Sequence, residues 1–246
     1  MSTLQNKIDF AVILRVKNAN PNGDPLNGNR PRTDYSNFGE MTDVSIKRKI
    51  RDRLLERWIA DGKNDDGNMI FVQSDDRKAD DAKSLRERAE IVLGKDLATP
   101  KTAEKACEKW IDVRAFGQLF ALKSNKKAGK KKEDGSDEEG DTGVSIGIRG
   151  PVTVQSAFSV EPIDISSVQI TKSVSGEGDG TKRGSDTMGM KHRVDQGVYV
   201  FYGSMNPQLA GRTDFSDADA EAIKKVLPKL FENDKVIVWD FVLQPG

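Results

Sequence analysis

The N-terminal part of the chain alternates between apolar and polar residues from Ile8 to Val16. Phe10, Val12, Leu14 and Val16 occupy every second position, so they fall on one side of an extended chain. A half-buried strand presents its apolar side chains in this way, because its other face meets water. The pattern therefore predicts that this stretch is the first strand of a sheet.

The next stretch, residues 18–32, breaks this alternation. Its sequence, NANPNGDPLNGNRPR, holds three prolines and two glycines among asparagines, and these residues favour turns over regular elements. We therefore expect a long loop that no strand or helix crosses. A helix then follows, which Thr42 or Asp43 can cap at its start and which Asp61-Gly62 ends after about Ala60.

This helix carries basic residues on two sides. At about 100° per residue, one arc collects the apolar side chains that we expect to face the sheet, namely Val44, Ile50, Leu54, Leu55 and Trp58. Lys47 and Arg51 fall inside the same arc. The opposite side, which we expect in water, carries Lys49, Arg53 and Arg57.

Helical and extended patterns alternate through the rest of the chain. Spacing and stop signals predict one helix from Lys83 to Leu93, with Gly94 as its stop, and another from Pro100 through Trp110, with helical spacing continuing to Phe120. Short apolar runs between glycines and prolines then predict strands. The expected elements are strands at 144–148, 152–160, 168–174 and 198–202, a hairpin tip at 176–189, a helix from Ser216 that Pro228 kinks, and a last strand at 236–243.

The order of these elements is strand, helix, several strands, helix and strand, with large insertions. It predicts an α+β fold with a ferredoxin-like or RRM-like core. We expect a single domain over residues 1–246, in which residues 61–142 form a helical insertion. The insertion ends in residues 123–142, a basic block followed by an acidic block, which predicts a solvated charged loop.

The composition argues against a disulfide-linked, zinc-binding, secreted or membrane-spanning protein. The 246 residues include one cysteine, Cys107, and one histidine, His192, so an internal disulfide is impossible and the usual Cys/His zinc sites lack ligands. The chain has no run of 18 apolar residues and no secretory pattern, so we expect a cytoplasmic protein without a membrane span.

Charge places any nucleic-acid site in one part of the chain. Lys+Arg and Asp+Glu both total 39, so the net charge indicates no polyanionic partner. Residues 1–58, however, hold eleven basic against seven acidic residues. Any nucleic-acid site must therefore be local, and the N-terminal fifth of the chain is net basic.

Catalytic chemistry has one candidate, His192 in the run GMKHRVDQG. With Lys191, Arg193 and Asp195 nearby, it has the chemistry of a general base in an endoribonuclease. A lone histidine in a basic run is more often a nucleic-acid contact or a packed polar residue. No glycine spacing matches a nucleotide-binding loop. We expect a protein that is not an enzyme and that uses no metal or cofactor, with an endoribonuclease of RRM-like fold as the alternative.

The basic pair on the helix needs anionic partners. Lys47 and Arg51 lie four residues apart on the arc expected to face inward, and a buried cation without a counter-charge costs free energy. Carboxylates such as Asp24 or Asp34 would satisfy them. Phosphates would also do so, because the neighbouring asparagine-glycine loop can offer backbone N–H donors. Chemistry alone leaves both possibilities open.

A set of motifs, taken in order, resembles a known family. The motifs are NANPNGDP at 18–25, RPR at 30–32, TDV at 42–44, KRKIR at 47–51, DVRAFG at 112–117, RGPV at 149–152, MGMKHRV at 188–194 and GVYV at 197–200. Together they resemble the backbone subunit of type I CRISPR Cascade complexes, a crRNA-binding protein of the RAMP superfamily. They are closest to the type I-C (Dvulg) form.

The resemblance implies an RRM-like palm with a helical insertion and a protruding β-hairpin thumb, here between about residues 163 and 188. It implies that several copies stack in a helical filament along one crRNA, and that each thumb displaces a nucleotide at a regular interval. Target DNA would be read through pairing with the guide. Further partners would be the guide-processing subunit, the large and small Cascade subunits and a recruited helicase-nuclease, all serving antiviral defence.

The resemblance also assigns guide-RNA contacts to particular positions. They are Asn20, Asn22, Gly23, Asp24, Arg30 and Arg32 in the loop, Lys47 and Arg51 on the helix, and Arg114, Lys191, His192 and Arg193 further along the chain. Two departures from the family stand out. The charged loop 123–142 is longer than the family needs, and the end at 236–246 comes earlier than in type I-C members, as either a natural short variant or a truncation would explain.

Overall fold

A computed structural model describes the chain except for residues 1, 65, 123–143, 172–187, 233–235 and 246. The chain forms two compact units. Unit 1 consists of Met1–Lys7, Leu54–Thr153 and Met205–Ala222, and unit 2 consists of Ile8–Arg53, Val154–Ser204 and Ile223–Gly246. Unit 1 thus contains the described part of the predicted helical insertion together with the residues that flank it on both sides, and with Met1–Lys7 and Met205–Ala222.

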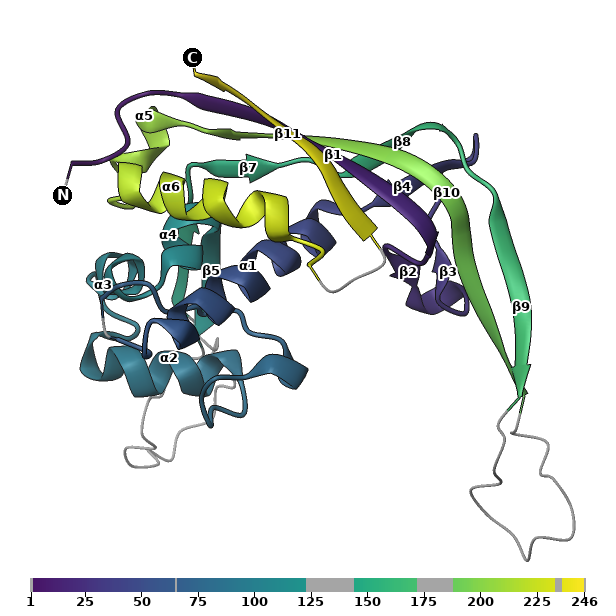
Figure 1. The fold of residues 1–246 in the computed structure, drawn as a ribbon. Helices are drawn as coiled ribbons and strands as arrows, with labels where there is room; N and C mark the ends of the chain where they lie inside the picture. Colours follow the sequence, from purple (N-terminus) through teal and green to yellow (C-terminus); the bar gives the residue numbers. More distant parts are fainter. Residues whose placement is uncertain (1, 65, 123–143, 172–187, 233–235, 246) are drawn as a thin grey trace, which may run out of the picture. The chain divides into compact units, whose positions relative to one another are not determined.

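Unit 2 is built on an antiparallel sheet (Figure 1). Its strands follow the order β11-β1-β10-β8-β4, and β7 and β9 also pair with β10. These strands are β1 (Ile8–Ala19), β4 (Phe38–Met41), β7 (Val152–Val154), β8 (Ala157–Pro162), β9 (Ile165–Thr171), β10 (Met188–Met205) and β11 (Val236–Pro245). The fold is therefore mixed α and β with an antiparallel sheet.

The alternation in β1 is confirmed, since Phe10, Val12, Leu14 and Val16 are all almost completely buried. Removing such side chains from water stabilises a fold by about 1.5–3 kcal/mol each. The first half of α1 (Asp43–Ala60) and the end of α6 (Asp217–Val226) lie on one side of the sheet (Figure 1). Periodicity thus identified the strand and the face that the core covers.

Unit 1 is mainly helical. Its further elements are η2 (Asp75–Arg77), α2 (Leu85–Leu93), η3 (Gly94–Asp96), α3 (Thr102–Lys109), α4 (Ile111–Phe116), β5 (Gly117–Leu122), β6 (Val144–Arg149) and α5 (Pro207–Ala210). Its core centres on Phe71, whose ring centroid lies 4.7 Å from that of Trp110 and 5.2 Å from that of Phe120. Such tilted aromatic pairs add to the free energy of burial.

Two predicted elements between residues 100 and 160 are wrong. The helical spacing does not continue to Phe120, because Gly117 ends α4 with φ +82° and residues 117–122 form β5, paired with β6. A Cβ at Gly117 would lie only 2.2 Å from the Ile148 carbonyl oxygen, so glycine is required there. The stretch predicted as one strand, 152–160, is two strands, β7 and β8.

Two further predicted helices are present in the structure. The helices from Thr42 or Asp43 to Ala60 and from Lys83 to Leu93 are confirmed as α1 and α2, and Ser84 caps the latter. Pro228 ends α6 and leads into η5 (Leu227–Lys229). The charged loop 123–142 and most of the hairpin tip 176–189 lie outside the described residues. None of the described helices is long and apolar enough to cross a membrane.

Candidate nucleic-acid interface

Residues 18–32 form a small hairpin within unit 2. β2 (Gly23–Asp24) pairs with β3 (Arg30–Pro31), and η1 (Pro25–Asn27) joins them. The prediction that no regular element crosses this segment is therefore wrong. A Cβ at Gly23 would lie 1.9 Å from Asn29 Oδ1, so a larger residue there would displace the Asn29 side chain.

Polar side chains hold this hairpin together. Asn20 Nδ2 donates to the backbone oxygen of Asn29 at 2.7 Å. Asp24 Oδ1 accepts from the backbone N–H of Leu26 at 3.2 Å and from Arg32 Nη2 at 3.3 Å. Short Asn and Asp side chains often replace backbone hydrogen bonds in this way. Asn20 and Asp24, both predicted RNA contacts, thus have structural partners inside the hairpin.

Asn22 joins the hairpin to the start of α1. Its Oδ1 accepts from the backbone N–H of Thr42 at 2.9 Å and from Thr42 Oγ1 at 3.1 Å. Thr42 Oγ1 in turn accepts from the backbone N–H of Ser45 at 3.3 Å, as expected of a residue that caps a helix. The hairpin is therefore anchored to the positive end of the α1 dipole.

Lys47 and Arg51 lie on the first half of α1 and are partly buried. Lys47 Nζ contacts Asp43 Oδ2 at 2.9 Å, and their side chains are 28% and 39% exposed. The carboxylate partner is thus the residue four positions earlier, and neither Asp24 nor Asp34. Asp34 instead accepts from the backbone N–H groups of Ser36 and Phe38. A half-exposed pair of this kind contributes little to stability.

The predicted faces of α1 are only partly right. Val44, expected to face inward, is 69% exposed, whereas Ile46 is buried. Lys49 and Arg53, expected in water, are partly buried, and Lys49 Nζ lies 5.1 Å from the centroid of the Phe231 ring. Ile50, Leu54, Leu55 and Trp58 are buried as predicted. The predicted apolar face is therefore right except in the first turn of the helix, where Ile46 takes the place of Val44.

A two-stranded ribbon extends from the sheet, formed by β9 and the first part of β10 (Figure 1). Lys191 pairs with Val168, His192 with Ser167 and Arg193 with Ser166. Because side chains alternate along a strand, His192 lies on one face of the ribbon, and Lys191 and Arg193 lie on the other. The predicted cluster of three residues is therefore divided between two faces.

The hairpin and the ribbon meet through three polar side chains. Arg30 Nη1 donates to Ser167 Oγ at 3.1 Å, and Ser167 Oγ lies 2.8 Å from His192 Nδ1. Sequence reasoning named Arg30 and His192 and missed Ser167. Its position opposite His192 depends on the register of β9 against β10, which no local pattern reveals.

Some buried polar atoms of this region have no hydrogen-bond partner among the described residues. They include Asn20 Oδ1, Arg32 Nε and Arg193 Nε. Unpaired buried polar groups are costly and rare. Arg193 Nε nevertheless lies within ion-pair distance of Asp195 Oδ1, at 3.7 Å, and Arg32 pairs with Asp24 through Nη2. Both Nε atoms are buried, so they are not themselves a surface for a phosphate.

Arg114 lies in unit 1, and each of its three guanidinium nitrogens donates to an acceptor within the chain. Nε and Nη2 donate to the two carboxylate oxygens of Asp219 at 3.0 and 2.7 Å, and Nη1 donates to the backbone oxygens of Cys107 and Gly67. This buried fork-to-fork pair accounts for Arg114 without RNA. An RNA contact by Arg114, as predicted from the resemblance, would have to compete with this buried pair.

Unit 1 also contains an open pocket of about 530 Å³ with mostly acidic charges. Its ionisable lining includes Asp66, Glu104, Glu108, Asp214 and Asp219 together with Arg57 and Arg114. Cys107 lines it too, and burial raises the pKa of this thiol to about 11, so it is an unreactive thiol at neutral pH. Such a lining repels a polyanion. No cluster of metal-ligating side chains occurs among the described residues.

Comparison with known proteins shows which family this chain matches. The family described as "CRISPR-associated protein Cas7" matches residues 6–236. A relative from Haloferax volcanii, also described as "CRISPR-associated protein Cas7", is 27% identical over 241 residues, which is 95% of this chain. The chain spans 66% of the length of that relative.

Among solved structures, a chain of a "CRISPR RNA-guided surveillance complex, pre-nicking" has a similar fold. The TM-score is 0.51 at 14% sequence identity, with 91% of this chain and 71% of the other covered. At this identity the likeness concerns the fold alone.

Proposed function

Because the chain belongs to the family of CRISPR-associated protein Cas7, we propose that it is a crRNA-binding backbone subunit of a CRISPR surveillance complex. The observation that carries this proposal is the family match over residues 6–236. The fold neighbour, which is described as part of an RNA-guided surveillance complex, supports it.

In its finer form, the proposal is a type I-C Cascade subunit that works in the cytoplasm. The sheet of unit 2 would be an RRM-like palm, and the β9–β10 ribbon would be the base of the thumb. Copies would line up along one crRNA, beside the guide-processing, large and small subunits. Target DNA would pair with the guide, and a helicase-nuclease would then be recruited.

RNA would bind to the basic surface of unit 2. Lys47 and Arg51 would contact backbone phosphates, and Arg30 and Arg32 would bind phosphates from the hairpin. The backbone of Gly23 would allow close approach. Asn20, Asn22 and Asp24 would act mainly by shaping the hairpin, because their side chains already bond within it. Lys191 and Arg193 would contact RNA on the face of the ribbon opposite to His192.

Binding of this kind is independent of sequence, which gives a direct test. The full chain should bind single-stranded RNAs of unrelated sequence with affinities within a few-fold of each other. Each affinity should fall steeply with salt, because every phosphate contact releases a counterion. Filter binding across a salt series measures both properties. Binding restricted to one sequence, or binding that ignores salt, would contradict the proposal.

We propose no catalytic step for this chain. The alternative, an endoribonuclease that processes CRISPR precursor RNA, rests on His192 alone. Purified protein incubated with a repeat-containing RNA distinguishes the two functions. The backbone proposal predicts intact RNA, whereas clean cleavage that disappears in His192→Ala would establish the alternative.

A further inference from the structure

The contacts among Arg30, Ser167 and His192 constrain where their hydrogens lie. All three residues belong to unit 2 and come from β3, β9 and β10. Arg30 Nη1 lies 3.1 Å from Ser167 Oγ, and that oxygen lies 2.8 Å from His192 Nδ1. Both distances are within hydrogen-bond range.

A guanidinium group has only donors, so Arg30 must donate to Ser167 Oγ. The serine hydroxyl still has its own hydrogen and can donate it to one acceptor. If Nδ1 of His192 has a lone pair, the hydroxyl donates to it, and both contacts are ordinary hydrogen bonds. If Nδ1 instead has a hydrogen, both Nδ1 and Arg30 donate to Ser167 Oγ, which can accept two hydrogen bonds, and the exposed hydroxyl donates to water. The first arrangement is the stronger one, because a hydroxyl that accepts from the Arg30 cation is a better donor to Nδ1, and hydrogen bonds in a chain strengthen one another.

We infer that Arg30 and Ser167 hold neutral His192 as one tautomer, with the hydrogen on Nε2, so that its ring donates a hydrogen bond to an oxygen of bound RNA. Ser167 is then a positioning residue and His192 a contact residue. The ribbon face that carries His192 also carries Met188 and Met190, so this donor is a polar group in an otherwise apolar stretch of β10. The inference rests on the proposed function for the identity of the ligand.

This arrangement also bears on catalysis. A general base needs a nitrogen lone pair that faces its substrate. Here the Nδ1 lone pair faces Ser167, and Nε2 carries a hydrogen, so the imidazole acts as a donor. The same geometry that presents His192 to RNA therefore opposes its use as the base of a ribonuclease.

The tautomer can be measured without RNA. The chain has a single histidine, so one set of imidazole signals in a long-range ¹H–¹⁵N spectrum at about pH 8, where imidazole is neutral, reports His192 alone. We expect the pattern of a single Nε2–H tautomer in the full-length protein. Ser167→Ala should convert it to a mixture of tautomers, and Ser167→Thr, which keeps a hydroxyl on a residue suited to strands, should restore it. A mixture in the parent protein, or a pattern that Ser167→Ala leaves unchanged, would overturn the inference.

RNA binding tests the role of the donor. The side-chain nitrogen of glutamine reaches the position of Nε2, and that of asparagine reaches the position of Nδ1. His192→Gln should therefore bind RNA within about two-fold of the parent protein, whereas His192→Asn should bind about three- to ten-fold more weakly, as the loss of one hydrogen bond implies. The salt dependence should stay the same in both variants, since no charge is removed.

The outcomes separate the two proposals. Equal affinities for His192→Gln and His192→Asn would overturn the role of the donor while the chain still binds RNA. A parent protein that binds no RNA would overturn the proposed function, and the spectrum would still decide the tautomer. Thermal unfolding of each variant checks that the fold is kept; these side chains are exposed or partly exposed, so little change is expected.

Discussion

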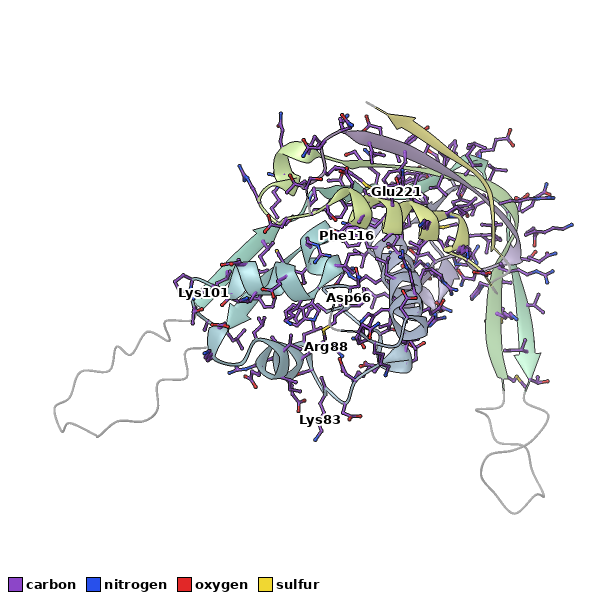
Figure 2. All side chains as sticks on the ribbon, turned by 60° about the vertical axis from the view of Figure 1, so that its left-hand side comes forward. Asp66, Lys83, Arg88, Lys101, Phe116 and Glu221 are labelled. Atoms are coloured by element: carbon purple, nitrogen blue, oxygen red, sulfur yellow. The ribbon has the colours of Figure 1, made fainter. Side chains whose placement is uncertain are left out.

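The buried arginines of unit 1 and the basic side chains of unit 2 differ in how completely they are paired within the chain. In unit 1, Arg88 is 3% exposed; its Nε and Nη2 bind the two oxygens of Asp80 at 2.7 and 2.9 Å, and its Nη1 binds the Phe71 carbonyl at 2.8 Å. Figure 2 labels Arg88 among the side chains of this unit. Arg114 is bound to Asp219 in the same forked manner. Each guanidinium is satisfied by the chain itself.

In unit 2 the corresponding pairs are looser. Arg32 reaches Asp24 through a single contact at 3.3 Å, and its Nε has no partner among the described residues. Lys47 and Asp43 are both partly exposed. Arg88 and Arg114 are thus buried and forked onto a carboxylate, whereas the pairs of Arg32 and Lys47 are single contacts of partly exposed groups. A buried pair that loses one partner is destabilised strongly, whereas a surface pair matters little to stability.

The largest expected effect is on stability in unit 1. Asp219→Ala leaves the Arg114 guanidinium buried without its counter-charge and removes the acceptor for the Ser216 backbone N–H at the start of α6. We expect the free energy of unfolding to fall by about 3–5 kcal/mol, measured by chemical denaturation. Asp217→Ala, an exposed acidic residue in the same helical turn, is the matched control and should cost less than about 1 kcal/mol. Equal losses of unfolding free energy in both variants would show that the Arg114–Asp219 pair contributes no more to stability than an exposed carboxylate does.

The next largest effect is on RNA binding in unit 2. The double variant Lys47→Glu/Arg51→Glu should bind RNA about 100-fold more weakly or worse, equally for unrelated sequences, with a salt dependence shallower by about 1 to 2 in log–log slope. Its stability should change by less than about 1 kcal/mol. Arg77→Glu/Arg86→Glu makes the same charge change at exposed positions of unit 1 and should bind as the parent does. Undiminished binding by the Lys47/Arg51 variant would remove these residues from the RNA site.

The smallest effect is the change in the pH dependence of stability that Asp80 of unit 1 causes. Hydrogen bonding from Arg88 lowers the pKa of Asp80 in the folded protein. A carboxyl whose pKa is lower in the folded state stabilises the fold above its unfolded pKa of about 3.9, and that contribution is lost as the pH falls through the folded pKa. Asp80→Asn should therefore be less stable than the parent at neutral pH and should show a flatter loss of stability below about pH 4. Parallel curves for the two proteins would contradict this role for Asp80.

Local patterns of the sequence were enough to predict β1, α1 and α2, because alternation, helical spacing and caps depend on neighbouring residues. The strand β5 was missed because its apolar residues also fit a helix, and only the φ angle of Gly117 and its approach to Ile148 exclude that reading. The pair Lys47–Asp43 follows the ordinary four-residue spacing of a helix, so it could have been predicted from the sequence. The sequence analysis instead named the more distant Asp24 and Asp34 as possible partners.

Other features depend on contacts that the sequence does not reveal. Arg114 and Asp219 are 105 residues apart, and Ser167 meets His192 only through the register of β9 and β10. The loop motif identified where the candidate site lies. It did not reveal that Asn20, Asn22 and Asp24 form hydrogen bonds that hold the hairpin together and join it to α1.

We propose that unit 2 binds guide RNA and that this RNA organises several copies of the chain. The most direct test is the native mass of the purified particle before and after exhaustive ribonuclease treatment. We predict a particle of several chains that contains RNA and that falls to smaller species once the RNA is degraded. A particle free of nucleic acid, with a mass unchanged by ribonuclease, would contradict the claim.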